Sequence, residues 1–178
     1  IGLANATSVK GGILKSTDVF MVALIASLIF KQEKLFNPRF NFENFVVGNS
    51  NKYAHAVSVA VAESPGDIYN PLFIYGPSGL GKTHLAQAIG IEINKKFPEL
   101  VVLYVPANRF KTQYMDAVTV RNKLTDFLAF YMKMDVLIVD DIQDLQSPGS
   151  QNAFFNIFNH LHQSGKQLIF TSDRPSVE

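Results

Sequence analysis

The stretch Gly76-Pro77-Ser78-Gly79-Leu80-Gly81-Lys82-Thr83 fits the pattern G-x-x-x-x-G-K-[ST] of a phosphate-binding loop. An apolar run at 72–75 precedes it and a helical pattern at 83–96 follows it. Its glycines allow a tight turn that aims backbone N–H groups at phosphate oxygens. The positive end of the following helix adds to this attraction. A glycine-rich turn that contains a lysine by chance is the alternative, and the flanking strand and helix argue against it.

Two side chains of this loop have distinct chemistry. Lys82 is expected to reach the β- and γ-phosphates of ATP. The Thr83 hydroxyl is expected to be a ligand of Mg²⁺. The loop therefore predicts binding of a nucleotide together with a metal ion.

A second apolar run, at 135–139, ends in the carboxylates Asp140 and Asp141. Ligands of a doubly wound sheet lie beyond the carboxyl ends of its strands. Asp140 is therefore predicted to lie near Thr83 and to hold Mg²⁺ through water, and Asp141 to polarise the attacking water as a general base. A solvated strand end is the alternative, and the division of roles between the two carboxylates is open.

A later apolar run ends in Thr171-Ser172-Asp173-Arg174. If this strand opens on the same edge, a polar side chain there would sense the γ-phosphate or hold the water. Without the other two motifs, an ordinary turn before Pro175 would explain it equally well.

Apolar strands alternate with helical patterns from residue 72 onward. Strands are predicted at 72–75, 100–105, 135–139 and 167–171. Helices are predicted at 49–63 with Ser50 as the N-cap, at 83–96, at 108–132 as two helices, and at 151–163 before a left-handed Gly165. This alternation predicts an α/β fold, with a parallel sheet covered by helices on both faces.

The composition of the 178 residues limits the classes of function. Hydrophobic residues make up 47% and charged residues 17%, which is typical of a folded domain rather than a disordered chain. The net charge of +1 gives no strong field toward nucleic acid or acidic lipid, so any contact with DNA would depend on local groups. The absence of cysteine excludes disulfides, thiolate metal sites and cysteine nucleophiles.

Residues 1–36 are predicted to form an N-terminal extension with one apolar helix, preceding an ATP-binding domain at 37–178. The uncharged run at 19–30 is shorter than the ~20 residues of a membrane span. It also has no small-x-small cleavage pattern before Lys31. We therefore favour a buried helix over a membrane-associated segment, and a cytoplasmic protein.

Residues 37–178 resemble the ATPase domain of the DnaA family of bacterial replication initiators. The likeness includes the opening segment 37–48, the segment 70–76 that leads into the loop, and His84-Leu85 after Thr83. It continues in Asp140-Asp141-Ile142-Gln143, where a second aspartate replaces the glutamate of most relatives, and in Phe154-Phe155 and 171–174.

The resemblance implies a P-loop NTPase of the AAA+ class that binds ATP or ADP with Mg²⁺. It carries the catalytic roles to Lys82 and Asp141 and the sensor role to Asp173, and it places the loop around Phe45 near the adenine. The residues expected to bind the cofactor are Gly76, Pro77, Ser78, Gly79, Leu80, Gly81, Lys82, Thr83, His84, Val46 and Val47; those expected to hold the metal are Thr83 and Asp140.

The family also implies partners. Its ATP-bound domains assemble side by side on double- and single-stranded origin DNA, and the replicative helicase or its regulators are further partners. Family members contact single-stranded DNA with helices between the second and third strands. Here that region offers Arg109, Lys111, Arg121 and Lys123, for which a solvated helix face is an equal alternative.

The sequence departs from the family after Gln143, where 144–149 replace an aromatic residue and a longer charged loop, and at Pro106-Ala107, which replace a polar pair. Because the sequence ends shortly after Asp173, we expect it to lack the family's last strand, helical lid, trans-acting arginine and helix-turn-helix domain. Isolated hydrolysis is therefore expected to be slow or absent, since such an arginine contributes roughly 10³–10⁵ in rate.

Two other functions use a similar core. A DnaA-like regulator or helicase loader would act through protein partners. A GTPase would carry Asn-Lys-x-Asp, and the nearest match, Asn122-Lys123-Leu124-Thr125, has threonine in place of the aspartate.

Overall fold

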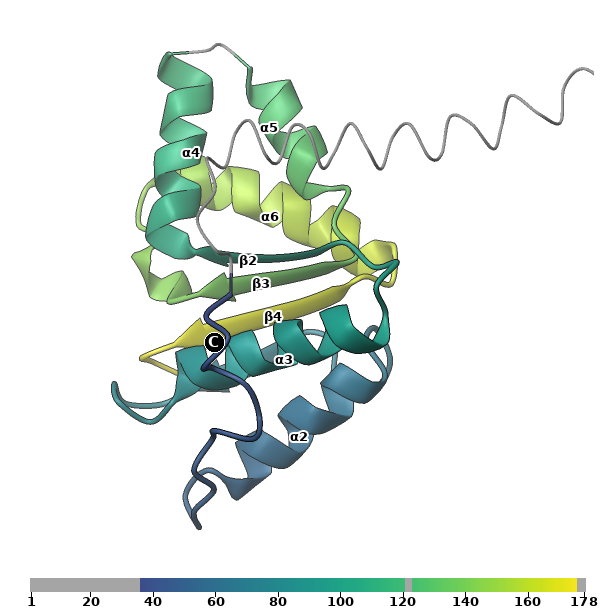
Figure 1. Ribbon diagram of the computed structural model, residues 1–178. Helices are drawn as coiled ribbons and strands as arrows, with labels where there is room; N and C mark the ends of the chain where they lie inside the picture. The colour runs from purple at the N-terminus through teal and green to yellow at the C-terminus, as the bar shows by residue number, and fades with distance from the viewer. Residues whose placement is uncertain (1–35, 121–122, 176–178) are drawn as a thin grey trace, which may run out of the picture. The chain divides into compact units, whose positions relative to one another are not determined.

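The computed structural model describes residues 36–120 and 123–175 (Figure 1). Of the predicted N-terminal extension at 1–36, the structure describes only Phe36, so the predicted apolar helix lies outside the described residues. Arg121 lies outside them as well. Among the residues that are described, no helix is long and apolar enough to cross a membrane.

Four parallel strands form one sheet in the order β1-β4-β3-β2. They are β1 (Leu72–Tyr75), β2 (Val102–Pro106), β3 (Val136–Asp140) and β4 (Gln167–Ser172). All four were predicted, and three have ends shifted by one or two residues. The strand β2 begins later than expected because Leu100 still belongs to the turn after the preceding helix, where its N–H donates to the Phe97 carbonyl (3.0 Å).

Helices cover both faces of this sheet, as predicted (Figure 1). On one face α3 (Lys82–Lys96) packs against the strands, and α2 (Lys52–Glu63) packs against α3. The other face carries α4 (Ala107–Thr119), α5 (Leu124–Tyr131) and α6 (Pro148–Gln163). A short 3₁₀ helix, η1 (Ile142–Asp144), follows β3 and was not predicted.

Two predicted helix starts are wrong. The N-cap of α2 is Asn51 rather than Ser50, and the Asn51 side chain holds the preceding loop instead of the helix end. Its Oδ1 accepts the Gly48 N–H (2.7 Å) and its Nδ2 donates to the Val46 carbonyl (3.0 Å). Helix α6 begins three residues early, at Pro148, because proline suits a first helical turn, where its missing N–H needs no partner. The left-handed Gly165 after α6 is confirmed, with φ 68°.

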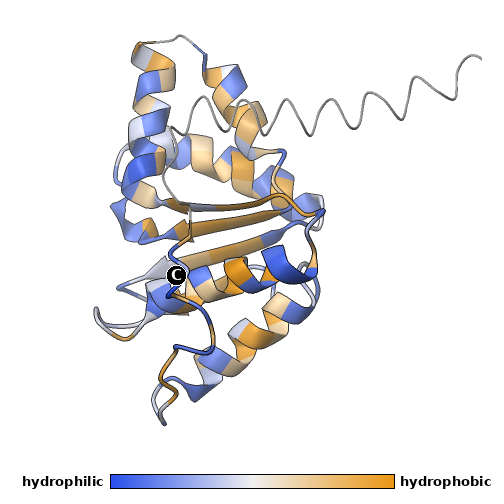
Figure 2. Ribbon diagram, viewed as in Figure 1, coloured by the Kyte–Doolittle hydropathy of each residue, from blue (hydrophilic) through white to orange (hydrophobic). Residues whose placement is uncertain are grey.

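The core lies between the sheet and its helices. Every residue of the central strands β3 and β4 is buried, whereas the edge strand β1 alternates between buried and exposed positions. Figure 2 shows this as strands in hydrophobic colours between helices of mixed character. Phe36 fills a notch in α3 that glycine leaves open, because a Cβ on Gly90 would lie 2.4 Å from Phe36 Cε1.

Candidate nucleotide-binding site

The predicted phosphate loop lies at the carboxyl edge of the sheet, between β1 and α3. Its first N–H, that of Gly76, donates to the Ser172 carbonyl at the end of β4 (3.2 Å). Residues 77–80 are exposed, and Gly81 takes a left-handed conformation (φ 86°) immediately before α3. The loop is therefore accessible from solvent and opens onto the N-terminus of a helix, as a phosphate-binding loop requires.

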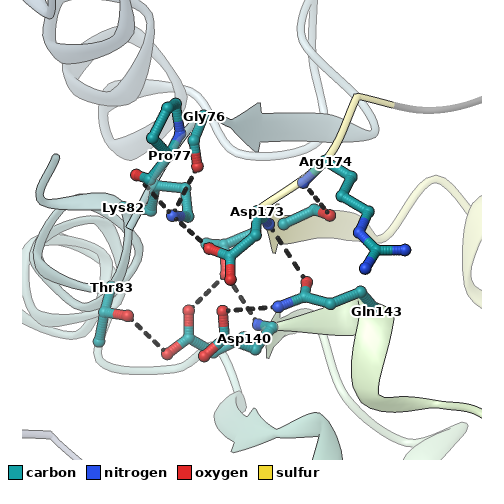
Figure 3. A network of polar contacts seen from close by, with 11 residues as sticks. Gly76, Pro77, Lys82, Thr83, Asp140, Gln143, Asp173 and Arg174 are labelled. Carbon is teal, nitrogen blue, oxygen red and sulfur yellow. Dashed lines mark hydrogen bonds and ion pairs between the residues drawn. The ribbon is translucent and has the colours of Figure 1, made fainter. Parts of the chain in front are cut away.

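Lys82 lies within this loop with only 8% of its surface exposed. Its Nζ donates to the carbonyls of Gly76 (2.8 Å) and Pro77 (3.1 Å) and to Asp173 Oδ1 (2.8 Å), as Figure 3 shows. An ammonium group has three donors, so this arrangement uses all of them. Two of these acceptors belong to the loop backbone, and the third is a carboxylate from the end of β4.

Asp173 reaches Lys82 because β4 lies between β1 and β3 in the sheet. The Asp173 side chain is 46% exposed, so solvent screens this ion pair. Its neighbour Arg174 extends away from Lys82 (Figure 3), and the Arg174 N–H donates to Ser172 Oγ (3.1 Å).

The structure brings Thr83 and Asp140 together, as the sequence predicted. Thr83 Oγ1 donates to Asp140 Oδ2 at 2.9 Å (Figure 3). The same carboxylate is buried and accepts two more hydroxyl hydrogen bonds, from Tyr104 to Oδ2 (2.7 Å) and from Thr171 to Oδ1. Burial, followed by the hydrogen bond to Asp140, raises the pKa of the Tyr104 phenol above its ordinary value.

The oxygen atoms of Thr83 and Asp140 suit Mg²⁺ better than they suit a cation that is held by protein ligands alone. In the described part of the chain, no group of three or more His, Cys, Asp and Glu residues could hold a metal ion. Mg²⁺ is usually held by one or two carboxylates together with substrate phosphates and water. The Thr83 hydroxyl and the Asp140 carboxylate match that pattern, and a triphosphate bound in the adjacent loop would supply further oxygen ligands.

Asp141 follows β3 in a left-handed conformation (φ 56°) that its backbone hydrogen bond supports. Its N–H donates to Thr171 Oγ1 (2.9 Å), and its Oδ1 accepts from Gln143 Nε2 (3.2 Å). Burial raises the pKa of the Asp141 carboxyl; the Gln143 hydrogen bond opposes this, and the charge of Asp140 adds to it. A raised pKa makes a carboxylate a better proton acceptor near neutral pH.

Gln143 also joins Asp141 to the end of β4. Its Oε1 accepts the Asp173 N–H (3.3 Å), while its Nε2 contacts Asp141. The three predicted catalytic residues are therefore linked: Lys82 contacts Asp173 directly, and one glutamine joins Asp173 to Asp141. Their catalytic roles stay predictions.

The opening segment, which carries the loop predicted to lie near the adenine, packs against the phosphate loop. The ring of Phe45 lies against Gly81, where a Cβ would be 2.8 Å from Phe45 Cε2, and it contacts the His84 ring edge-on (5.2 Å). Val46 and Val47 are 84% and 50% exposed. They are available to a base, and their contact with adenine stays a prediction.

The side chain of His84 contacts the opening segment rather than the phosphate loop. Its Nε2 donates to the Asn41 carbonyl (2.7 Å), and its ring stacks on Phe40 with centroids 5.0 Å apart. His84 therefore holds the opening segment onto α3. Its predicted contact with nucleotide would have to come from its backbone.

The four candidate DNA contacts do not share one environment. Arg109 and Lys111 are half-buried on α4, Lys123 is exposed just before α5, and Arg121 lies outside the described residues. Burial raises the pKa of Tyr131 and the nearby charge of Arg109 opposes this, which places Arg109 close to the aromatic core under α4 and α5.

Sequence reasoning missed Gln87 and Tyr104 as site residues, and it singled out Thr171 only as part of the stretch 171–174. Each is a polar group that the structure buries, in α3, β2 and β4 respectively. Because a buried polar group needs a hydrogen-bond partner, a phenol or hydroxyl inside a strand was a usable signal.

Comparison with known proteins identifies relatives of the domain that carries this site. A family model described as the bacterial DnaA ATPase domain matches residues 36–178. The chain belongs to this DnaA ATPase domain family. The resemblance noted in the sequence over 37–178 is therefore confirmed, and so is the α/β fold of the AAA+ class.

Similar proteins include the chromosomal replication initiator protein DnaA of Bacteroides thetaiotaomicron, 55% identical over 143 residues. That alignment covers 79% of this chain and 30% of the relative, so the chain spans about a third of the length of the DnaA protein it matches. A solved replication initiator DnaA bound to AMPPCP and single-stranded DNA is 39% identical, with a TM-score of 0.74 over 80% of this chain and 44% of that chain.

The DnaC helicase loader shares the fold. It is 20% identical, with a TM-score of 0.66 over 80% of this chain and 82% of that chain.

Proposed function

We propose that this DnaA-family domain binds ATP or ADP with Mg²⁺ in the loop 76–83, and that ATP controls its assembly on origin DNA. One observation carries the proposal: an exposed loop surrounds the Lys82 ammonium, while Thr83 Oγ1 lies 2.9 Å from Asp140 Oδ2. A cationic hydrogen-bond donor next to a hydroxyl–carboxylate pair suits a triphosphate and its metal ion.

Each side chain has a defined task in this proposal. The β- and γ-phosphates replace Asp173 and the Pro77 carbonyl as partners of Lys82, because Asp173 is partly exposed and the Pro77 contact (3.1 Å) is longer than the Gly76 contact (2.8 Å). Thr83 and Asp140 hold the magnesium ion, which neutralises charge on the β- and γ-phosphates when bound. Asp141 accepts a proton from the attacking water, and Asp173, once released, lies where it can sense the γ-phosphate.

Assembly on DNA is a proposal that goes beyond this domain, because the chain spans about a third of the length of the DnaA relative that it matches. The DnaA neighbour bound to AMPPCP and single-stranded DNA supports it. Lys111 on α4 and Lys123 just before α5 are the proposed phosphate contacts, together with Arg109 and Arg121. Self-assembly, and contact with a replicative helicase or its regulators, belong to the same proposal.

A regulator or helicase loader built on the same core is the alternative. The 55% identity with a replication initiator favours the initiator, because the likeness to the helicase loader is 20% and concerns the fold alone. Nucleotide-dependent binding to single-stranded DNA would support the initiator. Binding to a helicase without any DNA affinity would support the loader.

The central experiment is a titration of the purified chain with fluorescent ATP and GTP, each with Mg²⁺ and with EDTA. We expect saturable binding of ATP that Mg²⁺ strengthens. Failure of ATP to bind at any practical concentration would remove the assignment of the loop, and equal binding of GTP would remove the preference for adenine.

A further inference from the structure

We infer that Tyr104 is a positioning residue for the magnesium carboxylate Asp140. This inference rests on the proposed nucleotide site and adds a supporting layer to it. Tyr104 lies in β2 between the aliphatic residues Leu103 and Val105, and only 9% of its surface is exposed. Its hydroxyl crosses to the neighbouring strand β3 and donates to Asp140 Oδ2 at 2.7 Å.

This contact fixes the oxygen that also receives Thr83. Asp140 Oδ2 accepts both Tyr104 and Thr83, while Oδ1 accepts Thr171. Since a hydroxyl has one proton and two lone pairs, a Thr83 hydroxyl that donates to Asp140 turns its lone pairs elsewhere and can offer one to a cation. The orientation of the Thr83 hydroxyl therefore depends on the position in which Tyr104 holds Asp140 Oδ2.

Tyr104 is itself held from the helix side. Gln87, one helical turn after Thr83 on α3, lies next to the phenol and opposes the rise in its pKa, and its Oε1 accepts the Asn37 N–H (2.8 Å). The Tyr104 ring also contacts Phe36, with centroids 5.9 Å apart. Tyr104 is therefore packed between the opening segment, α3 and the Asp140 carboxylate.

Support of this kind tunes metal affinity. Residues that hydrogen-bond a metal ligand fix its orientation, and their loss typically costs about 10–100-fold in metal affinity or activity. Here neutral hydroxyl groups donate to Asp140, so they fix the orientation of its carboxylate without neutralising its charge. We therefore expect loss of the phenol to weaken the effect of Mg²⁺ on nucleotide binding and to leave metal-free binding unchanged.

A matched control exists in the same domain. Tyr131 on α5 is also buried, and its hydroxyl donates to Gln113 Oε1 on α4 (2.5 Å). The changes Tyr104→Phe and Tyr131→Phe each remove one buried phenol hydrogen bond, and only the first touches Asp140. A role of Tyr104 in stability alone predicts the same result for both variants.

The experiment measures the affinity of fluorescent ATP in EDTA and across a Mg²⁺ titration, for wild type and both variants. For Tyr104→Phe we expect wild-type affinity in EDTA and a roughly tenfold or greater rise in the Mg²⁺ concentration that gives half of the metal-dependent strengthening. Tyr131→Phe should leave both quantities unchanged. Wild-type Mg²⁺ dependence in Tyr104→Phe, or an equal loss of affinity with and without Mg²⁺, would overturn the inference.

A second variant covers the case in which Tyr104→Phe does not fold. Gln87→Met keeps the phenol but removes its polar neighbour on α3, and it should raise the Mg²⁺ requirement in the same direction by a smaller factor. An unchanged requirement in a folded Gln87→Met protein would then reject the positioning role. If wild type binds ATP with no influence of Mg²⁺, the proposed function fails together with this inference, whereas a failure confined to the variants rejects the inference alone.

Discussion

Replacement of Lys82 by alanine separates the binding role of this residue from its structural role. The three partners of Nζ are the Gly76 and Pro77 carbonyls and Asp173. Pro77 and Asp173 are exposed and Gly76 is half-buried, so water can hydrate these groups once the ammonium is gone. We expect Lys82→Ala to fold and to lose about 0–1 kcal/mol of stability, because the ion pair is solvent-screened.

The loss of affinity should be much larger. A hydrogen bond to a charged group contributes about 1.5–3 kcal/mol, so contacts with two phosphate groups contribute about 3–6 kcal/mol. Nζ already bonds Asp173 and two loop carbonyls, and giving up two of these contacts reduces the net effect by about 1–2 kcal/mol. The remaining ~1–5 kcal/mol corresponds to about 5- to 4,000-fold weaker binding, since each ~1.4 kcal/mol is tenfold.

Fluorescent ATP titration measures this change, and circular dichroism and urea unfolding check the fold. Lys96→Ala is the control, because Lys96 stands at the other end of α3 and pairs only loosely with Glu92 (3.5 Å) and Glu63 (3.7 Å). It should keep wild-type affinity. A folded Lys82→Ala protein with unchanged affinity would refute the assignment of the loop.

Three further substitutions test other parts of the structure. Asp141→Asn should keep ATP binding and lose turnover in a single-turnover assay; normal hydrolysis would exclude this carboxylate as the base. Thr171→Val, at a fully buried position, removes both a donor and an acceptor and should lower the free energy of unfolding by about 1–3 kcal/mol in urea. Gly90→Ala places a Cβ 2.4 Å from Phe36 Cε1 and should cost about 1–3 kcal/mol, whereas Gly48→Ala meets no atom within 4 Å and should be nearly neutral in the same assay.

Most secondary structure was predictable because it depends on local patterns. The four strands are short apolar runs bounded by turns, and α3 begins directly after the glycine loop. The helix start at Ser50 was wrong because the Asn51 side chain bonds the preceding loop, a choice that depends on where residues 46–48 lie. The start of α6 at Pro148 was missed although its reason is local, because proline suits the first turn of a helix.

The support around the carboxylate was harder to predict, because its members are far apart in the chain. Tyr104 and Asp140 are separated by 36 positions, and Asn37 and Gln87 by 50. No periodicity relates such pairs, and many tyrosines within strands only fill space. The direction of the His84 side chain, toward Asn41 across 43 positions, is of the same kind.

The sequence by itself determined the chemical groups of the site: a glycine loop with Lys82 and Thr83, a strand that ends in Asp140 and Asp141, and a later strand followed by Asp173. These follow from residue type and short-range spacing, which act through turn geometry and strand propensity. Only the tertiary structure decided that β4 lies between β1 and β3, which places Asp173 2.8 Å from Lys82 across 91 positions. Strand order depends on hydrogen bonds and packing between distant segments, and adjacent residues in the sequence do not carry that information.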